Sequence, residues 1–207
     1  ALTKEVAALG VDAIMVVTPA YNKPTPAGLK AHYAAVCDAA GDTPVILYNV
    51  PGRTACNMQA PTVAAIAEAN PNVAAIKDAS GSIWQMTENR RLAPSVTLLC
   101  GDDGLTLPAL SIGAKGVVSV VSNLAPKLCS DLIKAWDANE RAEAQRLHVA
   151  LQPLIDACFM ESSPTPVKYG LSLLGIGDGS LRLPLAEAES ATRERVAHLM
   201  SELGLLN

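Results

Sequence analysis

Short apolar runs alternate with helix-length, alanine-rich segments up to about residue 137, and this alternation limits the fold more than any other feature. The apolar runs span residues 11–18, 44–50, 73–79, 96–102 and 116–121, and the segments between them span 26–40, 60–69, 82–92, 104–112 and 125–137. The runs are too uniformly apolar for one face of a strand to meet water. They therefore predict five βα units, in which a parallel sheet is covered by helices.

Two parallel architectures fit such units, the open doubly wound sheet and the closed (β/α)8 TIM barrel. No apolar run leads into the glycine-rich turn of a dinucleotide site or a P-loop. Polar residues follow nearly every run instead, and reactive groups of barrels lie at the C-terminal ends of strands. This favours a barrel over residues 1–137, followed by a helical domain over residues 138–207, where helical patterns continue without strands. Because the chain opens inside a helical pattern without an initiator methionine, we expect earlier βα units to be missing.

Charge and cysteine content exclude several classes of protein. The 16 basic and 20 acidic residues give a net charge of -4 without a basic run, which argues against a nucleic-acid partner. Five cysteines without close pairing predict neither a disulfide framework nor a zinc cluster. The apolar stretches are shorter than the roughly 20 residues of a membrane helix, and no secretion signal opens the chain. We expect a cytoplasmic protein that does not bind a membrane.

Lys77 ends an apolar run, Val73 to Ile76, that otherwise reads as a strand buried on both faces. A cation there costs several kcal/mol unless it is paired, neutralised or used. An amine in a low-dielectric site loses its proton more easily, and this is the condition for a lysine that forms Schiff bases with carbonyl compounds. Alternatively, Lys77 reaches water from the end of the strand with its flexible side chain.

Two tyrosines and an arginine follow other strand ends, on the rim where Lys77 is expected. Tyr48 is the natural proton carrier beside an imine-forming lysine, and Tyr21 follows the first run. Arg53 offers a bidentate fork for a substrate carboxylate. The alternatives are half-buried core tyrosines bonded to backbone carbonyls and an exposed surface arginine.

Four segments in this order and spacing resemble the dihydrodipicolinate synthase family, within the pyruvate-dependent class I aldolases. They are Thr18–Pro24, Leu47–Thr54, Ile76–Gly81 and Leu99–Asp103. The resemblance implies a lyase that condenses pyruvate with aspartate 4-semialdehyde to give 4-hydroxy-tetrahydrodipicolinate. That reaction belongs to the diaminopimelate route of lysine biosynthesis, and no metal or organic cofactor is implied.

The resemblance also assigns roles to individual residues. Lys77 resembles the Schiff-base lysine, Tyr48 the proton relay, and Tyr21 the tyrosine that a partner subunit contributes. Arg53 would hold the carboxylate of the semialdehyde, and it separates this chain from the related N-acetylneuraminate lyases.

Gly101 and Val118 would contact pyruvate through backbone or wall atoms. The resemblance further implies a homodimer or homotetramer, and a helical C-terminal domain that helps to join dimers.

The chain departs from the family in two ways. It lacks the Gly-Thr-Thr-Gly-Glu loop whose threonines bind pyruvate, so we expect only about strands 4 to 8 of the family barrel. Ala20 stands where the lysine-feedback site of the family has an aromatic residue, which argues against feedback inhibition. Two alternatives therefore stay open: a sibling sugar-acid aldolase of the N-acetylneuraminate lyase type, and an inactive barrel fragment.

Overall fold

The computed structural model describes residues 1–206 and divides into two compact units. The first unit is Ala1–Val118, and the second begins at Ser119. The helical domain expected from residue 138 is a different division of the chain, and it stays a prediction.

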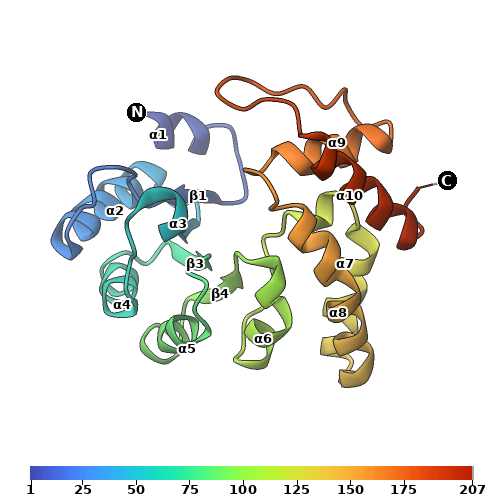
Figure 1. Ribbon diagram of the computed structural model, residues 1–207. Helices are drawn as coiled ribbons and strands as arrows, with labels where there is room; N and C mark the ends of the chain where they lie inside the picture. Colours follow the sequence, from blue (N-terminus) through green and yellow to red (C-terminus); the bar gives the residue numbers. More distant parts are fainter. Residues whose placement is uncertain (207) are drawn as a thin grey trace. The chain divides into compact units, whose positions relative to one another are not determined.

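The first unit is an α/β structure around a parallel four-stranded sheet in the order β1-β2-β3-β4 (Figure 1). The strands are β1 (Ile14–Val17), β2 (Val45–Asn49), β3 (Val73–Asp78) and β4 (Thr97–Cys100). The helices are α1 (Leu2–Ala7), α2 (Pro26–Ala40), α3 (Pro51–Thr54), α4 (Ala60–Ala69), α5 (Ile83–Leu92) and α6 (Thr106–Ser111), with the 3₁₀ turn η1 (Asp103–Leu105) before α6. The predicted α/β class with parallel strands is confirmed.

The register of the strands separates two rows of side chains. Tyr48 pairs with Val17 on one side and Lys77 on the other, and Lys77 pairs with Leu99. Residues paired in register point to the same face of a sheet, and the next residue along each strand points to the other. The next row, Asn49, Asp78 and Cys100, is therefore on the opposite face, where all three side chains are fully buried.

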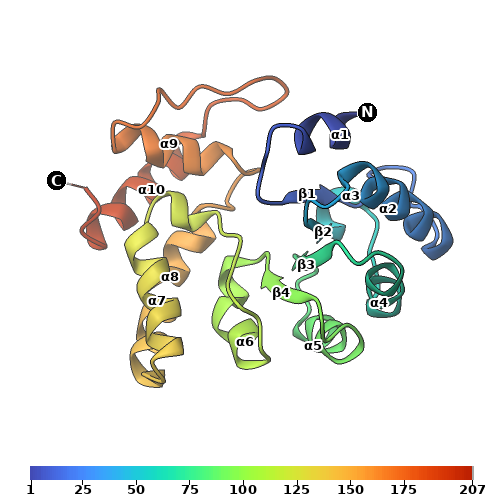
Figure 2. The same cartoon turned by 180° about the vertical axis from the view of Figure 1, so that it is seen from behind.

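The buried face of the sheet packs against the helices of the first unit. Leu47, Ile76 and Leu98 form its centre and join one apolar cluster with residues of α2, α4 and α5. In Figure 2 these three helices follow one another along the sheet. Burial of this face directs the other row, with Tyr48 and Lys77, away from the helices.

The run at residues 116–121 is a single β-bridge rather than the fifth strand that we predicted. Val117 bridges to Cys100, and the Val118 N–H donates to the Cys100 carbonyl at 2.8 Å. Beyond that point the chain turns into η2 (Val121–Asn123), where the Ser122 N–H donates to Ser119 Oγ. The serine side chain satisfies a backbone donor that a strand would need, which ends the extended segment.

The second unit is helical. It contains α7 (Pro126–Asp137), α8 (Arg141–Ala157), α9 (Thr165–Leu173) and α10 (Ser190–Glu202). The apolar spacing of Leu147, Leu151 and Leu154 buries one face of α8, which packs against α7 (Figure 2). The last helix begins at Ser190, and the N–H of the preceding Glu189 donates to the Glu161 carboxylate. Within residues 1–206, no helix is long and apolar enough to cross a membrane.

Candidate active site

Tyr48 and Lys77 lie together at the C-terminal ends of β2 and β3. Lys77 Nζ lies 3.9 Å from the centroid of the Tyr48 ring, and both side chains are half-buried. An ammonium at this distance is attracted by the negative face of the ring. The paired register of the two strands explains the contact, since it places both side chains on one face at one level.

Lys77 takes part in none of the ion pairs found among residues 1–206. A lysine held by a carboxylate is kept protonated and immobile, whereas a nucleophilic lysine must release its proton. The surroundings of Lys77 are therefore compatible with imine chemistry, with the Tyr48 ring as the neighbour that fixes its position.

Asp102, two residues past the end of β4, is a member of this neighbourhood that the sequence analysis did not single out. Its side chain caps no helix; instead Asp102 Oδ2 accepts a hydrogen bond from the Gly81 N–H at 3.1 Å. Burial raises the pKa of Asp102, the Gly81 hydrogen bond and the Lys77 charge lower it, and the Asp103 charge raises it. The position of Asp102 at a strand end was the signal that could have identified it.

Tyr21 and Arg53 are both exposed to solvent. Tyr21 is 91% exposed and has a positive φ of 69°, in the loop after β1. Among the described residues, no hydrogen bond or ring contact joins Tyr21 to Tyr48 or Lys77. Arg53 lies on the short helix α3, which directly follows β2 and Tyr48.

Gly101 directly follows β4, and Val118 lies beside the end of the same strand. The Gly101 N–H donates to the Asp78 carbonyl at 2.7 Å, so this donor already has a partner within the chain. Val118 is half-buried, and its N–H donates to Cys100. Any contact of Gly101 with a substrate would therefore use its carbonyl or its Cα rather than its N–H.

The sequence analysis missed a set of buried amides and a carboxyl behind the central pair. Asn49 and Asp78 follow Tyr48 and Lys77 directly and are both fully buried on the helix-covered face. Gln85 and Asn89 on α5 are buried beside them. The signal in the sequence was a polar residue in each strand at a position where the alternation requires burial.

The described residues contain no group of three or more His, Cys, Asp or Glu side chains that could hold a metal ion. Cys100 lies near Asp102, but burial raises its pKa to about 12, so it stays a neutral thiol. A neutral thiol is a poor metal ligand.

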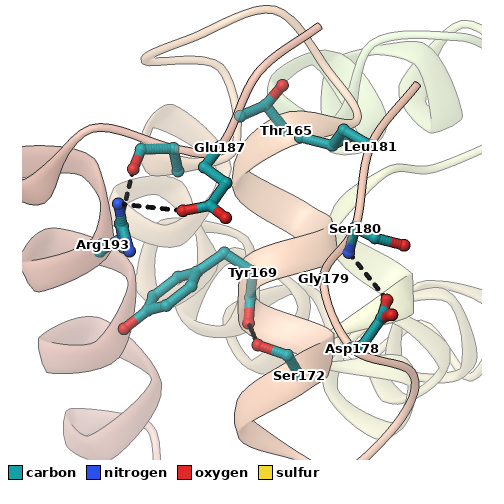
Figure 3. Close-up of a pocket in the computed structure, with 10 residues that line it drawn as sticks. Thr165, Tyr169, Ser172, Asp178, Gly179, Ser180, Leu181, Glu187 and Arg193 are labelled. Carbon is teal, nitrogen blue, oxygen red and sulfur yellow. Dashed lines mark hydrogen bonds and ion pairs between the residues drawn. The ribbon is translucent and has the colours of Figure 1, made fainter. Parts of the chain in front are cut away.

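The second unit has a pocket of about 440 Å³ between α9, α10 and the loop that joins them (Figure 3). Its charged groups are engaged within the chain: Arg193 Nε donates to the Ala188 carbonyl, and Asp178 Oδ1 accepts from the Ser180 N–H. None of the site residues expected from the sequence lines this pocket. The candidate active site is therefore the Tyr48 and Lys77 pair.

A family model and the similar proteins all match one enzyme family over nearly the whole chain. The model of the dihydrodipicolinate synthetase family matches residues 1–203. A 4-hydroxy-tetrahydrodipicolinate synthase from Synechococcus elongatus is 45% identical over 206 residues, which are 99% of this chain and 69% of that protein. A protein of the same name from Endomicrobium trichonymphae is 41% identical over 204 residues, which are 99% of this chain and 70% of that protein.

Solved structures of similar proteins have the same fold over the matched part. The crystal structure of dihydrodipicolinate synthase from Thermotoga maritima matches with a TM-score of 0.95 and 38% identity, covering 99% of this chain and 70% of that one. The chloride-inhibited enzyme from Acinetobacter baumannii, complexed with pyruvate, matches with a TM-score of 0.94 and 37% identity over 99% of this chain and 70% of that one. A monomeric dihydrodipicolinate synthase variant matches with a TM-score of 0.95 and 38% identity over 99% and 69% of the two chains.

Proposed function

Because this chain belongs to the dihydrodipicolinate synthetase family, we propose that it condenses pyruvate with aspartate 4-semialdehyde through a Schiff base on Lys77. The product is 4-hydroxy-tetrahydrodipicolinate, in lysine biosynthesis. The family and its named relatives confirm the lyase reading of the sequence over the sugar-acid aldolase and the inactive fragment. The observation that carries the role of Lys77 is its position 3.9 Å from the Tyr48 ring at the ends of neighbouring strands.

The first chemical step is imine formation. The neutral Lys77 amine attacks the C2 carbonyl of pyruvate, and the carbinolamine loses water to give a protonated imine. The imine nitrogen then accepts the electron pair of a C3–H bond when the proton leaves, which produces an enamine. The enamine carbon attacks the aldehyde carbon of the semialdehyde, and the substrate amino group finally displaces Lys77.

Tyr48 is the proposed proton carrier in these steps. Its ring stands over the Lys77 amine, so its hydroxyl belongs to the same small region of the site. A phenol can protonate the departing hydroxide of the carbinolamine and take a proton back later.

The other candidate residues would bind substrates. Arg53, exposed on α3 after the Tyr48 strand, would form a bidentate contact with the semialdehyde carboxylate. Gly101 and Val118 would line the pyruvate position. Tyr21 would act in the site of a partner subunit, and its exposure of 91% is compatible with that role.

We further propose that the four strands and the Val117 bridge together correspond to about strands 4 to 8 of a (β/α)8 barrel, with a helical domain at residues 138–207. The similar structures support this, since the chain covers 70% of the Thermotoga maritima protein at a TM-score of 0.95. The proposed assembly is a homodimer or homotetramer, although one similar protein is described as a monomeric variant.

Borohydride trapping tests the central proposal. The chain is incubated with pyruvate and reduced with sodium borohydride, and the modified residue is located by peptide mass spectrometry. We expect a single pyruvate-derived adduct on Lys77, because only an imine is reduced to a stable amine under these conditions. The Lys77→Arg variant should give no adduct.

Lys115→Arg is the matched control, because Lys115 lies outside the candidate site and should leave trapping unchanged. An adduct spread over several lysines, or one that persists in Lys77→Arg, would refute the nucleophile assignment. With trapping established, Arg53→Ala should raise the KM for aspartate 4-semialdehyde and leave the trapping of pyruvate unchanged.

A further inference from the structure

We propose that a buried hydrogen-bond network behind the strand ends, centred on Asp78 and Asn89, positions Lys77 against Tyr48. The inference rests on the proposed role of Lys77 and adds positioning residues that never touch the substrate. The network comprises Asn49, Asn57, Asp78, Gln85 and Asn89.

Asp78 is the first anchor of the network. Its carboxyl is fully buried, although it directly follows Lys77 in β3. Asp78 Oδ2 accepts a hydrogen bond from Asn89 Nδ2 at 2.7 Å, and Asp78 Oδ1 accepts from the Ser80 N–H at 2.8 Å. The end of β3 is thus tied to helix α5 and to the loop between them.

Asn49 is the second anchor, directly after Tyr48 in β2. Asn49 Nδ2 donates to Asn57 Oδ1 at 2.9 Å, and Asn49 Oδ1 accepts from the Met58 N–H at 2.9 Å. Asn57 is bonded in both directions to the amide of Gln85, with both distances at 3.0 Å. The end of β2 is therefore tied to the same helix.

Helix α5 joins the two anchors. Gln85 and Asn89 are four residues apart, so they lie on one face of the helix. Gln85 is linked to Asn49 through Asn57, and Asn89 is hydrogen-bonded directly to Asp78. Asn49 and Asp78 are themselves paired in the sheet. Since successive strand residues point to opposite faces, fixing Asn49 and Asp78 also fixes the Cα positions of Tyr48 and Lys77.

The network lowers the stability of the fold, so its presence is better explained by a role in positioning than by a contribution to stability. Asn89 Oδ1 is buried and has no hydrogen-bond partner among the described residues, and an unsatisfied buried acceptor lowers the stability of the folded state. Burial of the Asp78 carboxyl is also unfavourable for its charged form. Apolar side chains of similar size would fill this space without these costs, but they would not hold the strands in one fixed arrangement.

Proton NMR of the reductively methylated chain tests the geometry without requiring turnover. The N-methyl signal of Lys77, assigned with Lys77→Arg, should be shifted upfield by the ring current of Tyr48 and should lose this shift in Tyr48→Leu. Asn89→Leu and Gln85→Leu each break one arm of the network. Both should lose at least half of the upfield shift while the chain stays folded.

Pyruvate trapping gives the functional readout of the same variants. The rate constant of imine formation at saturating pyruvate should fall on the order of 10- to 100-fold, because a small displacement of a reacting group has effects of this size. The half-saturating pyruvate concentration should change little, since the network does not contact substrate.

Three further variants separate positioning from general stability. Ile66→Ala removes a buried side chain of α4 outside the network, and Thr87→Ala alters an exposed residue of α5. Both should keep the upfield shift and the trapping rate of the parent. The double variant Asp78→Asn/Asn89→Asp exchanges amide and carboxylate, preserves the hydrogen bond between positions 78 and 89, and should behave as the parent does.

The proposal is overturned if folded Asn89→Leu and Gln85→Leu keep the parent shift, or if Ile66→Ala loses as much as they do. If Asn89→Leu fails to fold, the double variant Asp78→Asn/Asn89→Asp provides the test. Loss of the upfield N-methyl shift in that variant also overturns the proposal. Absence of a pyruvate adduct in the parent chain would refute the proposed function alone, since the NMR readout of the network does not depend on it.

Discussion

At the scale of single residues, Tyr48 is the group whose two effects can be separated. Its ring holds the Lys77 amine, whereas its hydroxyl is proposed to move protons. Tyr48→Phe keeps the ring and removes the hydroxyl. We expect exchange of the C3 protons of pyruvate with deuterated solvent to slow by about 10²- to 10⁴-fold, the usual contribution of a general acid or base.

The ring contact itself should survive this change. The Lys77 adduct should therefore still form in Tyr48→Phe when the trapping reaction is run to completion. Deuterium exchange at the parental rate would show that another group carries the proton.

Asp78 gives a prediction about stability and pH. Burial raises the pKa of Asp78, while hydrogen bonds from Ser80 and Asn89 lower it in part, and the net shift is upward. The folded state therefore binds more protons than the unfolded chain between the ordinary aspartate pKa of about 3.9 and the raised pKa. The free energy of unfolding should fall as the pH rises through this interval, and Asp78→Asn should make the fall shallower in urea titrations.

Glu88→Gln is the control, because the pKa of Glu88 is shifted in the opposite direction to that of Asp78. The hydrogen bond from Arg91 lowers the pKa of the half-buried Glu88, so its contribution is present above the ordinary glutamate pKa and is lost as the pH falls through the lowered pKa. Glu88→Gln should therefore change only the acid end of the profile. An unchanged slope in Asp78→Asn would show that the Asp78 carboxyl is not the source of the fall.

At the scale of elements, Gly101 sets how closely β3 and β4 end beside each other. A Cβ at Gly101 would lie 2.6 Å from Ala79 Cβ and 3.1 Å from the Ala79 backbone, which the fold cannot accept without movement. Gly101→Ala should lower the free energy of unfolding by about 1 to 3 kcal/mol, as overpacking usually does. Denaturant titration measures the change.

Gly116→Ala provides the comparison within the same part of the sheet, since no atom lies within 4 Å of its added Cβ. It should change the free energy of unfolding by less than about 1 kcal/mol. Equal losses in the two variants would mean that the contact with Ala79 is not responsible.

The helices and strands also show which elements can be predicted from local sequence alone. The helices at 26–40 and 60–69 agree with α2 and α4 to the residue, because proline at the first turn and helix-forming alanines mark them locally. Residues 116–121 read as a strand from their valines, yet pairing with β4 ends at Val118, where Ser119 bonds to Ser122. Strand formation depends on a partner, and a partner is not a property of the segment itself.

At the scale of the whole molecule, we expect the outer edge of β1 to favour association between copies of this 207-residue chain. β1 pairs only with β2 among the described strands, and Met15 on it is 45% exposed. An unpaired apolar strand edge is a template for contact with another chain. Met15→Lys should reduce concentration-dependent light scattering, since a lysine at a strand edge opposes such pairing.

Leu2→Lys tests whether any new charge would do the same. Leu2 is 73% exposed but lies on helix α1 rather than on the edge strand. It should reduce scattering less than Met15→Lys does. Equal effects would assign the association to net charge rather than to the β1 edge.

The sequence by itself determined the parallel α/β class, most element positions and the family, because the local order of apolar and polar residues predicts burial and periodicity. It also singled out Lys77 and Tyr48, since polar groups at strand ends stand out against apolar runs. Only the tertiary structure decided that the Lys77 amine lies over the Tyr48 ring, that Asp102 bonds to Gly81, and that α5 links Asn49 to Asp78. The hydrogen bonds among these contacts join residues 11 to 28 positions apart, and register and packing alone bring them together.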